Sequence, residues 1–134
     1  MSVAPNILIC DDDPVVHESL GLYLDNDNFK HSDAYDGKES LAMAQATKPD
    51  LILLDVMMPG LDGFETYKTL CRRMGPNRQI PVVFLTGNND EETELKGLEL
   101  GAFDFIREPV KPKTLPIRVR HALDMSRLKK TNPT

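Results

Sequence analysis

The feature that most constrains the fold of this chain is a regular alternation of short apolar runs with longer amphipathic segments. The apolar runs have the length of strands, and the segments between them repeat apolar residues at helical spacing. Residues 51–54 are apolar throughout, which is typical of a central parallel strand covered on both faces. The expected strands are residues 7–10, 30–34, 51–54, 81–85 and 102–106.

Capping residues stand where the expected helices begin. Short polar side chains accept hydrogen bonds from the free amides of a first helical turn, and proline suits the first helical position. The last helix is expected over residues 115–130. The predicted caps are Asp13 before Pro14, Asp36 with Glu39, Asp62 with Glu65, and Asn89 with Glu92.

Apolar spacing also predicts which helix faces are buried. The first helix should bury Val16, Leu20, Tyr23 and Leu24, and the third Phe64, Tyr67, Cys71 and Met74. Cys10 in its strand and Cys71 on this face are therefore expected to be buried free thiols. Residues expected to be exposed are His17, His31 and His121, which share no common spacing.

Strict alternation with right-handed crossovers leaves few topologies. We expect an α/β fold, flavodoxin-like and doubly wound as (βα)5, with a five-stranded parallel sheet in the order 2-1-3-4-5. Residues 1–134 are expected to form one domain, with a core of about 6–130 and a tail or linker start at 131–134. The crevice then lies between the first and third strands.

Composition narrows the function classes. The net charge of −5 argues against direct nucleic-acid binding, and the basic C-terminal stretch is typical of a solvated helix or connector. Because the sequence shows no signal peptide and no apolar run near the ~20 residues of a membrane span, we expect a cytoplasmic protein without membrane contact.

Acidic residues follow two of the expected strands. Asp11 and Asp12 come after the first strand and Asp55 after the third, so their side chains should meet in the crevice. Gathered carboxylates repel one another unless a proton or a cation intervenes. A hard divalent ion, Mg²⁺ or Mn²⁺, prefers such oxygen ligands. Asp13 is expected to cap the helix rather than bind the ion.

The segments that carry these acids have a joint resemblance. Residues 7–14, 54–63, 83–87 and 101–106 read Ile-Leu-Ile-Cys-Asp-Asp-Asp-Pro, Leu-Asp-Val-Met-Met-Pro-Gly-Leu-Asp-Gly, Val-Phe-Leu-Thr-Gly and Gly-Ala-Phe-Asp-Phe-Ile. In order and spacing they resemble the receiver domain of bacterial response regulators, the phospho-accepting half of two-component signalling. The resemblance implies a signalling domain rather than an enzyme, one that takes part in its own phosphorylation and dephosphorylation.

The resemblance assigns roles to the acidic residues. It implies that Asp55 is the phospho-acceptor, taking the phosphoryl group from a phosphohistidine of a sensor histidine kinase or histidine phosphotransfer protein. Asp12 would bind Mg²⁺ directly and Asp11 directly or through water, and the backbone carbonyl of Met57 would add an oxygen. The side chains of Met57 and Met58 are expected to pack rather than bind.

The resemblance also implies a switch. Thr86 is placed like the hydroxyl that turns inward to the phosphoryl group, and Phe105 like the aromatic residue that follows it. The readout face would be the fourth helix, fifth strand and fifth helix, which could also form a homodimer. A downstream effector domain or protein would carry the output.

One position departs from the family. Glu108 stands where the family places lysine, before Pro109, and by resemblance the Glu108–Pro109 bond is a candidate cis peptide. A charge reversal at ~4 Å is worth on the order of 4 kcal/mol per term before screening. Glu108 could rotate away, Arg107 or Lys111 could replace the cation although strand alternation points Arg107 elsewhere, or the domain could signal without efficient phosphorylation. We favour retained metal binding with weakened chemistry.

Two rival functions remain open on the sequence. A haloacid dehalogenase-type phosphohydrolase would use Asp11 as nucleophile and Asp13 as acid/base, but that reading leaves the segment around Asp55 unexplained. For a phosphorylation-independent interaction module Glu108 is the best evidence, whereas the acidic crevice and Thr86 argue against complete loss of phosphorylation.

Overall fold

The computed structural model describes residues 3–75, 80–87 and 91–131. The strands are β1 (Asn6–Cys10), β2 (Lys30–Ala34), β3 (Leu51–Asp55), β4 (Val82–Thr86) and β5 (Asp104–Arg107). The helices are α1 (Pro14–Asp25), α2 (Gly37–Thr47), α3 (Gly63–Met74), α4 (Glu91–Glu99) and α5 (Thr114–Thr131).

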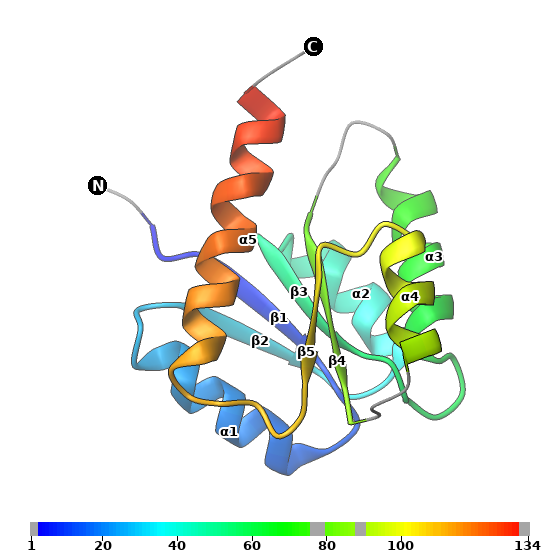
Figure 1. The fold of residues 1–134 in the computed structure, drawn as a ribbon, viewed down its shortest axis with the longest axis horizontal. Coiled ribbons are helices and arrows are strands. Elements are labelled where there is room, and N and C mark those ends of the chain that lie inside the picture. Colours follow the sequence, from blue (N-terminus) through cyan, green and yellow to red (C-terminus); the bar gives the residue numbers. More distant parts are fainter. Residues whose placement is uncertain (1–2, 76–79, 88–90, 132–134) are drawn as a thin grey trace.

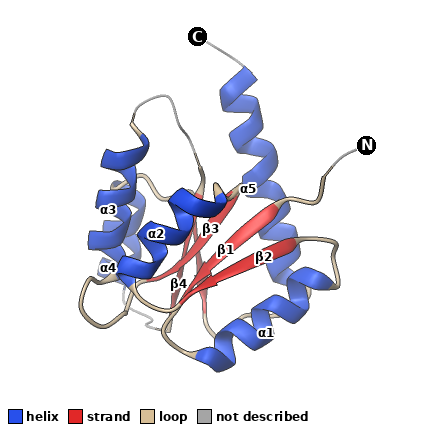
Figure 2. Cartoon of the chain, turned by 180° about the vertical axis from the view of Figure 1, so that it is seen from behind, coloured by secondary structure: helices blue, strands red, loops and turns tan. Residues whose placement is uncertain are grey.

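The strands pair in parallel in the order β2-β1-β3-β4-β5, which confirms the predicted topology. Helices α1 and α5 cover one face of the sheet, and α2, α3 and α4 cover the other (Figures 1 and 2). Because β1 lies between β2 and β3, the winding direction reverses at β1 and β3. A crevice for functional residues is expected at the carboxyl ends of these two strands.

Alternate side chains of the central strand feed a core on each face of the sheet. Ile52 and Leu54 pack with residues of α2 and α3, and Leu51 and Leu53 pack with residues of α1 and α5. All four side chains are fully buried. The uninterrupted apolar run is therefore explained by burial on both sides.

Three of the predicted aspartate caps form the expected bonds to backbone N–H groups. The Oδ1 atoms of Asp13, Asp36 and Asp62 accept from the N–H groups of Val15 (2.9 Å), Glu39 (2.7 Å) and Glu65 (2.9 Å). The cap predicted at Asn89 lies outside the described residues. These caps fix where α1, α2 and α3 begin.

The buried face of α1 differs from the predicted one by a rotation of about one residue. The buried residues are His17, Leu20, Gly21 and Leu24, whereas Val16 and Tyr23 are partly buried. The prediction that His17 is exposed is therefore wrong. It failed because both ring nitrogens find hydrogen-bond partners inside the protein.

A similar correction applies to α3. Cys71 is exposed, because the buried stripe runs through Gly63, Tyr67 and Leu70 instead. Cys10 is buried, as predicted, and both thiols are free. In the part of the chain that the structure describes, no helix combines the length and apolar character needed to cross a bilayer.

Candidate functional site

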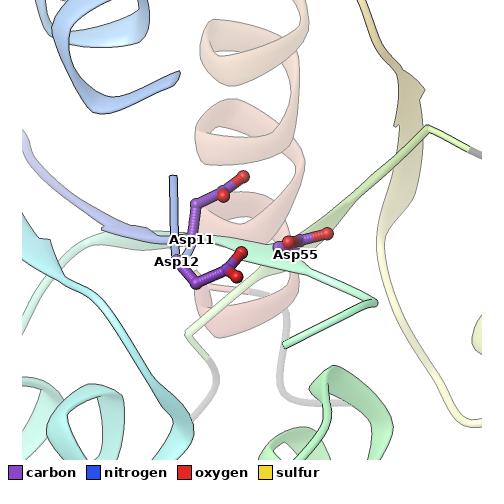
Figure 3. Close-up of side chains that lie close together, drawn as sticks. All are labelled: Asp11, Asp12 and Asp55. Atoms are coloured by element: carbon purple, nitrogen blue, oxygen red, sulfur yellow. The ribbon is translucent and has the colours of Figure 1, made fainter. Parts of the chain in front are cut away.

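Three carboxylates meet at the carboxyl ends of β1 and β3 (Figure 3). Asp11 and Asp12 directly follow β1, and Asp55 is the last residue of β3. One carboxylate oxygen from each of the three lies within 4.8 Å of the others. Asp11 and Asp55 are buried, and Asp12 is exposed. The site thus opens to solvent on the Asp12 side.

The backbone and side chain of Asp11 are firmly held. Its N–H donates to the carbonyl of Ala34 at 3.1 Å, and its Oδ1 accepts from the N–H of Asp13 at 2.9 Å. Its other carboxylate oxygen, Oδ2, is buried and has no hydrogen-bond partner among the described residues. A buried polar atom of this kind is costly unless a ligand completes it.

Asp55 is held against the loop that follows β3. Its Oδ1 accepts from the N–H of Met57 at 3.1 Å. Gly63 lies so close that a Cβ there would sit 2.2 Å from the carbonyl oxygen of Asp55, which leaves space for glycine alone. The side chain of Met57 is 71% exposed, so its predicted packing role is wrong, whereas Met58 is buried as expected.

Burial and neighbouring charge disfavour the ionised form of Asp55. Desolvation is the largest cause that raises its pKa to about 7, and the nearby charge of Asp11 adds to it. The bond from Met57 opposes the rise, and Glu108 and Asp12 reinforce it. The pKa of Asp11 is also raised, mainly by burial. The site therefore carries strong repulsion that a cation would relieve.

These residues fit a hard divalent cation. The candidate ligand atoms are carboxylate oxygens that lie close together. One of the three carboxylates, that of Asp11, has a buried oxygen without a hydrogen-bond partner among the described residues. Mg²⁺ and Mn²⁺ prefer such ligands, with water or phosphate completing the shell.

Glu108 lies just after β5 at the edge of this site. Its N–H donates to the carbonyl of Thr86 at 2.8 Å, and the Glu108–Pro109 peptide bond is cis. The side chain is half-buried, and burial is the largest cause that raises its pKa. The charges of Asp11, Asp13 and Asp12 raise the pKa of Glu108 further, so Glu108 lies within electrostatic range of the acidic cluster.

Arg107 and Lys111 are the two cations that could stand in for the family's lysine. Arg107 reaches Glu94 of α4 with an N–O distance of 2.7 Å, in keeping with the strand alternation that points it away. Lys111 lines a groove of about 500 Å³ together with Arg107, Glu94 and residues of β5 and α5. Arg107 and Lys111 therefore both line a groove on the face formed by α4, β5 and α5.

Thr86 and Phe105 lie on neighbouring strands beside the acids. Thr86 ends β4 and is buried, and Phe105 is 6% exposed with its ring packed on Phe84 at 5.3 Å between centroids. Phe105 also fills the space beside Gly97 of α4. The aromatic ring is thus in its inward, buried orientation.

Comparison with known proteins agrees with this arrangement. Residues 7–120 match the model of the response regulator receiver domain. The chain belongs to the response regulator receiver domain family. The transcriptional regulatory protein AfsQ1 of Streptomyces coelicolor is 38% identical over 119 residues, which are 89% of this chain and 51% of that protein. The DNA-binding response regulator MtrA of Mycobacterium tuberculosis is 38% identical over 117 residues, 87% of this chain and 50% of that protein.

Solved receiver domains have the same fold. The receiver domain of the Francisella response regulator 1452 superposes with a TM-score of 0.82 at 30% identity, over 91% of this chain and 98% of that one. The chemotaxis protein CheY4 of Vibrio cholerae gives 0.81 at 28% identity, over 89% and 98%. The receiver domain described here spans about half the length of the curated relatives it matches.

The placement of Asp13 in this receiver domain argues against the phosphohydrolase alternative. Asp13, its required acid/base, is exposed and caps α1 by accepting from Val15 at 2.9 Å. The convergent acids are instead Asp11, Asp12 and Asp55. The structure also adds a residue that the sequence reasoning missed, because His17 contacts the backbone of Asp11.

Substitution of Gly97 should test the inward position of Phe105. A Cβ at residue 97 would lie 2.2 Å from Cε2 of the ring, so Gly97→Ala must displace it. Overpacking should lower the free energy of unfolding by about 1–3 kcal/mol. The higher helix propensity of alanine opposes this loss by about 1 kcal/mol. Urea denaturation measures the difference.

The matched control is the same substitution in a Phe105→Ala background. There the obstructing ring is absent, so Gly97→Ala should stabilise the protein by up to about 1 kcal/mol. Equal destabilisation in both backgrounds would contradict the packing account.

Proposed function

We propose that Asp55 of this receiver domain accepts a phosphoryl group from a phosphohistidine on a partner protein. The observation that carries the proposal is the convergence of Asp11, Asp12 and Asp55, with the buried Oδ2 of Asp11 left without a partner among the described residues. A carboxylate oxygen of Asp55 would form the new O–P bond while the P–N bond to the histidine breaks. The departing histidine nitrogen keeps the electron pair of that bond.

A divalent ion belongs to this proposal. Asp11, Asp12 and Asp55 would hold Mg²⁺ or Mn²⁺, with the backbone carbonyl of Met57 as a further oxygen ligand. When bound, the ion supplies positive charge between the carboxylates and the incoming phosphoryl oxygens. The firm anchoring of Asp11 and the bond from Met57 to Asp55 keep these ligands in place. Phosphoryl transfer depends mainly on such alignment.

The switch would run from Asp55 through Thr86 to Phe105. Thr86 ends the strand next to β3, and Phe105 is already seated against Phe84. A phosphoryl group adds about −1.5 to −2 charges and strong acceptor oxygens. The hydroxyl of Thr86 would bond these oxygens and hold Phe105 in its buried orientation.

The partners follow from the same proposal. The donor would be a sensor histidine kinase or a histidine phosphotransfer protein in the cytoplasm. The curated relatives are about twice as long and are named as transcriptional or DNA-binding regulators, which supports an effector domain or protein downstream. The face of α4, β5 and α5 would receive the signal and could pair two copies.

Glu108 should weaken this chemistry without abolishing it. Its charge raises the pKa of Asp55 and would add repulsion toward a phosphoryl group. The same observation favours the second candidate function, a receiver that signals by binding without efficient phosphorylation.

Labelling with acetyl phosphate separates the two. We expect slow, Mg²⁺-dependent addition of one phosphoryl group, located on Asp55 by peptide mass spectrometry and absent in EDTA. Rapid stoichiometric labelling would contradict the weakening by Glu108. Labelling of any other residue would contradict the assignment of Asp55, and absence of labelling with Mg²⁺ bound would favour the binding-only receiver.

A further inference from the structure

His17 is a buried, polar side chain to which the proposed chemistry assigns no role. It lies on α1, is 5% exposed and stacks on Tyr35 with 4.1 Å between ring centroids. Its Nε2 is 2.7 Å from the backbone carbonyl oxygen of Asp11, and its Nδ1 is 2.6 Å from Oδ1 of Asp33 on β2. Since a carbonyl oxygen only accepts, Nε2 is the donor in the bond to Asp11.

The bond from His17 completes the anchoring of Asp11. The N–H of Asp11 is bonded to Ala34, its Oδ1 to the N–H of Asp13, and its carbonyl to His17. Of the polar atoms of Asp11, only Oδ2 lacks a hydrogen-bond partner among the described residues, and it is buried beside the other acids. The peptide that leads into Asp12 is thereby fixed from the α1 side.

Asp33 holds His17 from the opposite side. Its Oδ1 bonds His17, while its Oδ2 lies 3.4 Å from Nδ1 of His31. His31 thus shares the Asp33 contact, and the structure gives it no contact with Asp11. The two histidines therefore differ in the bond to the carbonyl of Asp11, which His17 makes.

We propose that His17 is a positioning residue of the phosphoryl-transfer site, which holds the Asp11 carbonyl so that Asp11 and Asp12 present their carboxylates toward Asp55. The inference rests on the proposed function, because it assumes that these acids bind a divalent cation. Partners that orient metal ligands typically contribute 10–100-fold to metal affinity. Loss of the His17 ring should therefore weaken Mg²⁺ binding about tenfold.

Isothermal titration of the full chain with Mg²⁺ tests this directly. His17→Ala should bind about tenfold more weakly, and His17→Gln, which keeps one donor for the Asp11 carbonyl, about threefold more weakly. The matched control His31→Gln should bind like the parent. A merely structural histidine would lower the melting temperature but leave the dissociation constant of the folded protein unchanged.

Each outcome decides the question. If the parent binds Mg²⁺ and the His17 variants bind equally well, His17 has no positioning role and the proposed function stands. If the parent binds no Mg²⁺ at millimolar levels, the proposed function fails and the inference fails with it. Should His17→Ala not fold, the ratio of His17→Gln to His31→Gln carries the test, with threefold weaker binding supporting the role and equal binding overturning it.

Discussion

Glu108→Lys is expected to speed Mg²⁺-dependent phosphorylation of Asp55 by at least tenfold. The charge of Glu108 is one of those that raise the pKa of Asp55. Lysine would remove that repulsion and place a cation near the incoming phosphoryl oxygens. A charge reversal at ~4 Å is worth several kcal/mol before screening, and about 1.4 kcal/mol is enough for tenfold in rate. The rate of acetyl phosphate labelling is the measurement.

Two controls separate the local effect from net charge. Glu108→Gln removes the negative charge without adding a positive one, so its rate should lie between those of the parent and Glu108→Lys. Glu99→Lys, at an exposed position of α4, changes the net charge equally and should label at the parental rate. A Glu108→Lys rate equal to that of Glu99→Lys would show that Glu108 does not limit the chemistry.

Asp55→Asn should stabilise the metal-free protein, and the gain should grow with pH. The pKa of Asp55 is about 7 in the folded protein and ~3.9 in the unfolded chain. Between these values the folded state retains a proton that the unfolded state has lost, so the free energy of unfolding falls as pH rises. Asparagine carries no such cost and keeps an oxygen for the N–H of Met57.

Denaturation in EDTA between pH 5 and 8 measures this effect. The advantage of Asp55→Asn should approach the order of a few kcal/mol near neutral pH and shrink toward pH 5. Asp124→Asn, an exposed change on α5, should show no such pH-dependent gain. Parallel pH profiles for the parent and Asp55→Asn would contradict the unfavourable burial of this carboxylate.

The fold and the meeting of the acids were predictable from the sequence for one physical reason. Continuous apolar strands must be buried on both faces, and parallel strands bring their carboxyl ends to one edge. The apolar strands 51–54 and 7–10 therefore predict from sequence alone that Asp55 and Asp11 lie at this edge of the sheet. The unusual Glu108 could also be found, but only through the resemblance, because the family places lysine at this position before Pro109.

The features that escaped depend on contacts between distant residues. The burial of His17 follows from hydrogen-bond partners on Asp11 and Asp33, which no local pattern of α1 reveals. Its spacing with Leu20, Gly21 and Leu24 was the only available signal. The role of Gly97 could not be predicted for the same reason, since only the packed structure places it against Phe105.

Calorimetric titration of the parent and of Asp12→Asn with Mg²⁺ tests the shared cation site most directly. Asp12 is exposed, so its substitution should leave the fold intact while removing one of the gathered oxygens. The account predicts a single Mg²⁺ site in the parent, at least tenfold weaker in Asp12→Asn. Equal binding by both proteins, or no heat from the parent at millimolar Mg²⁺, would contradict it.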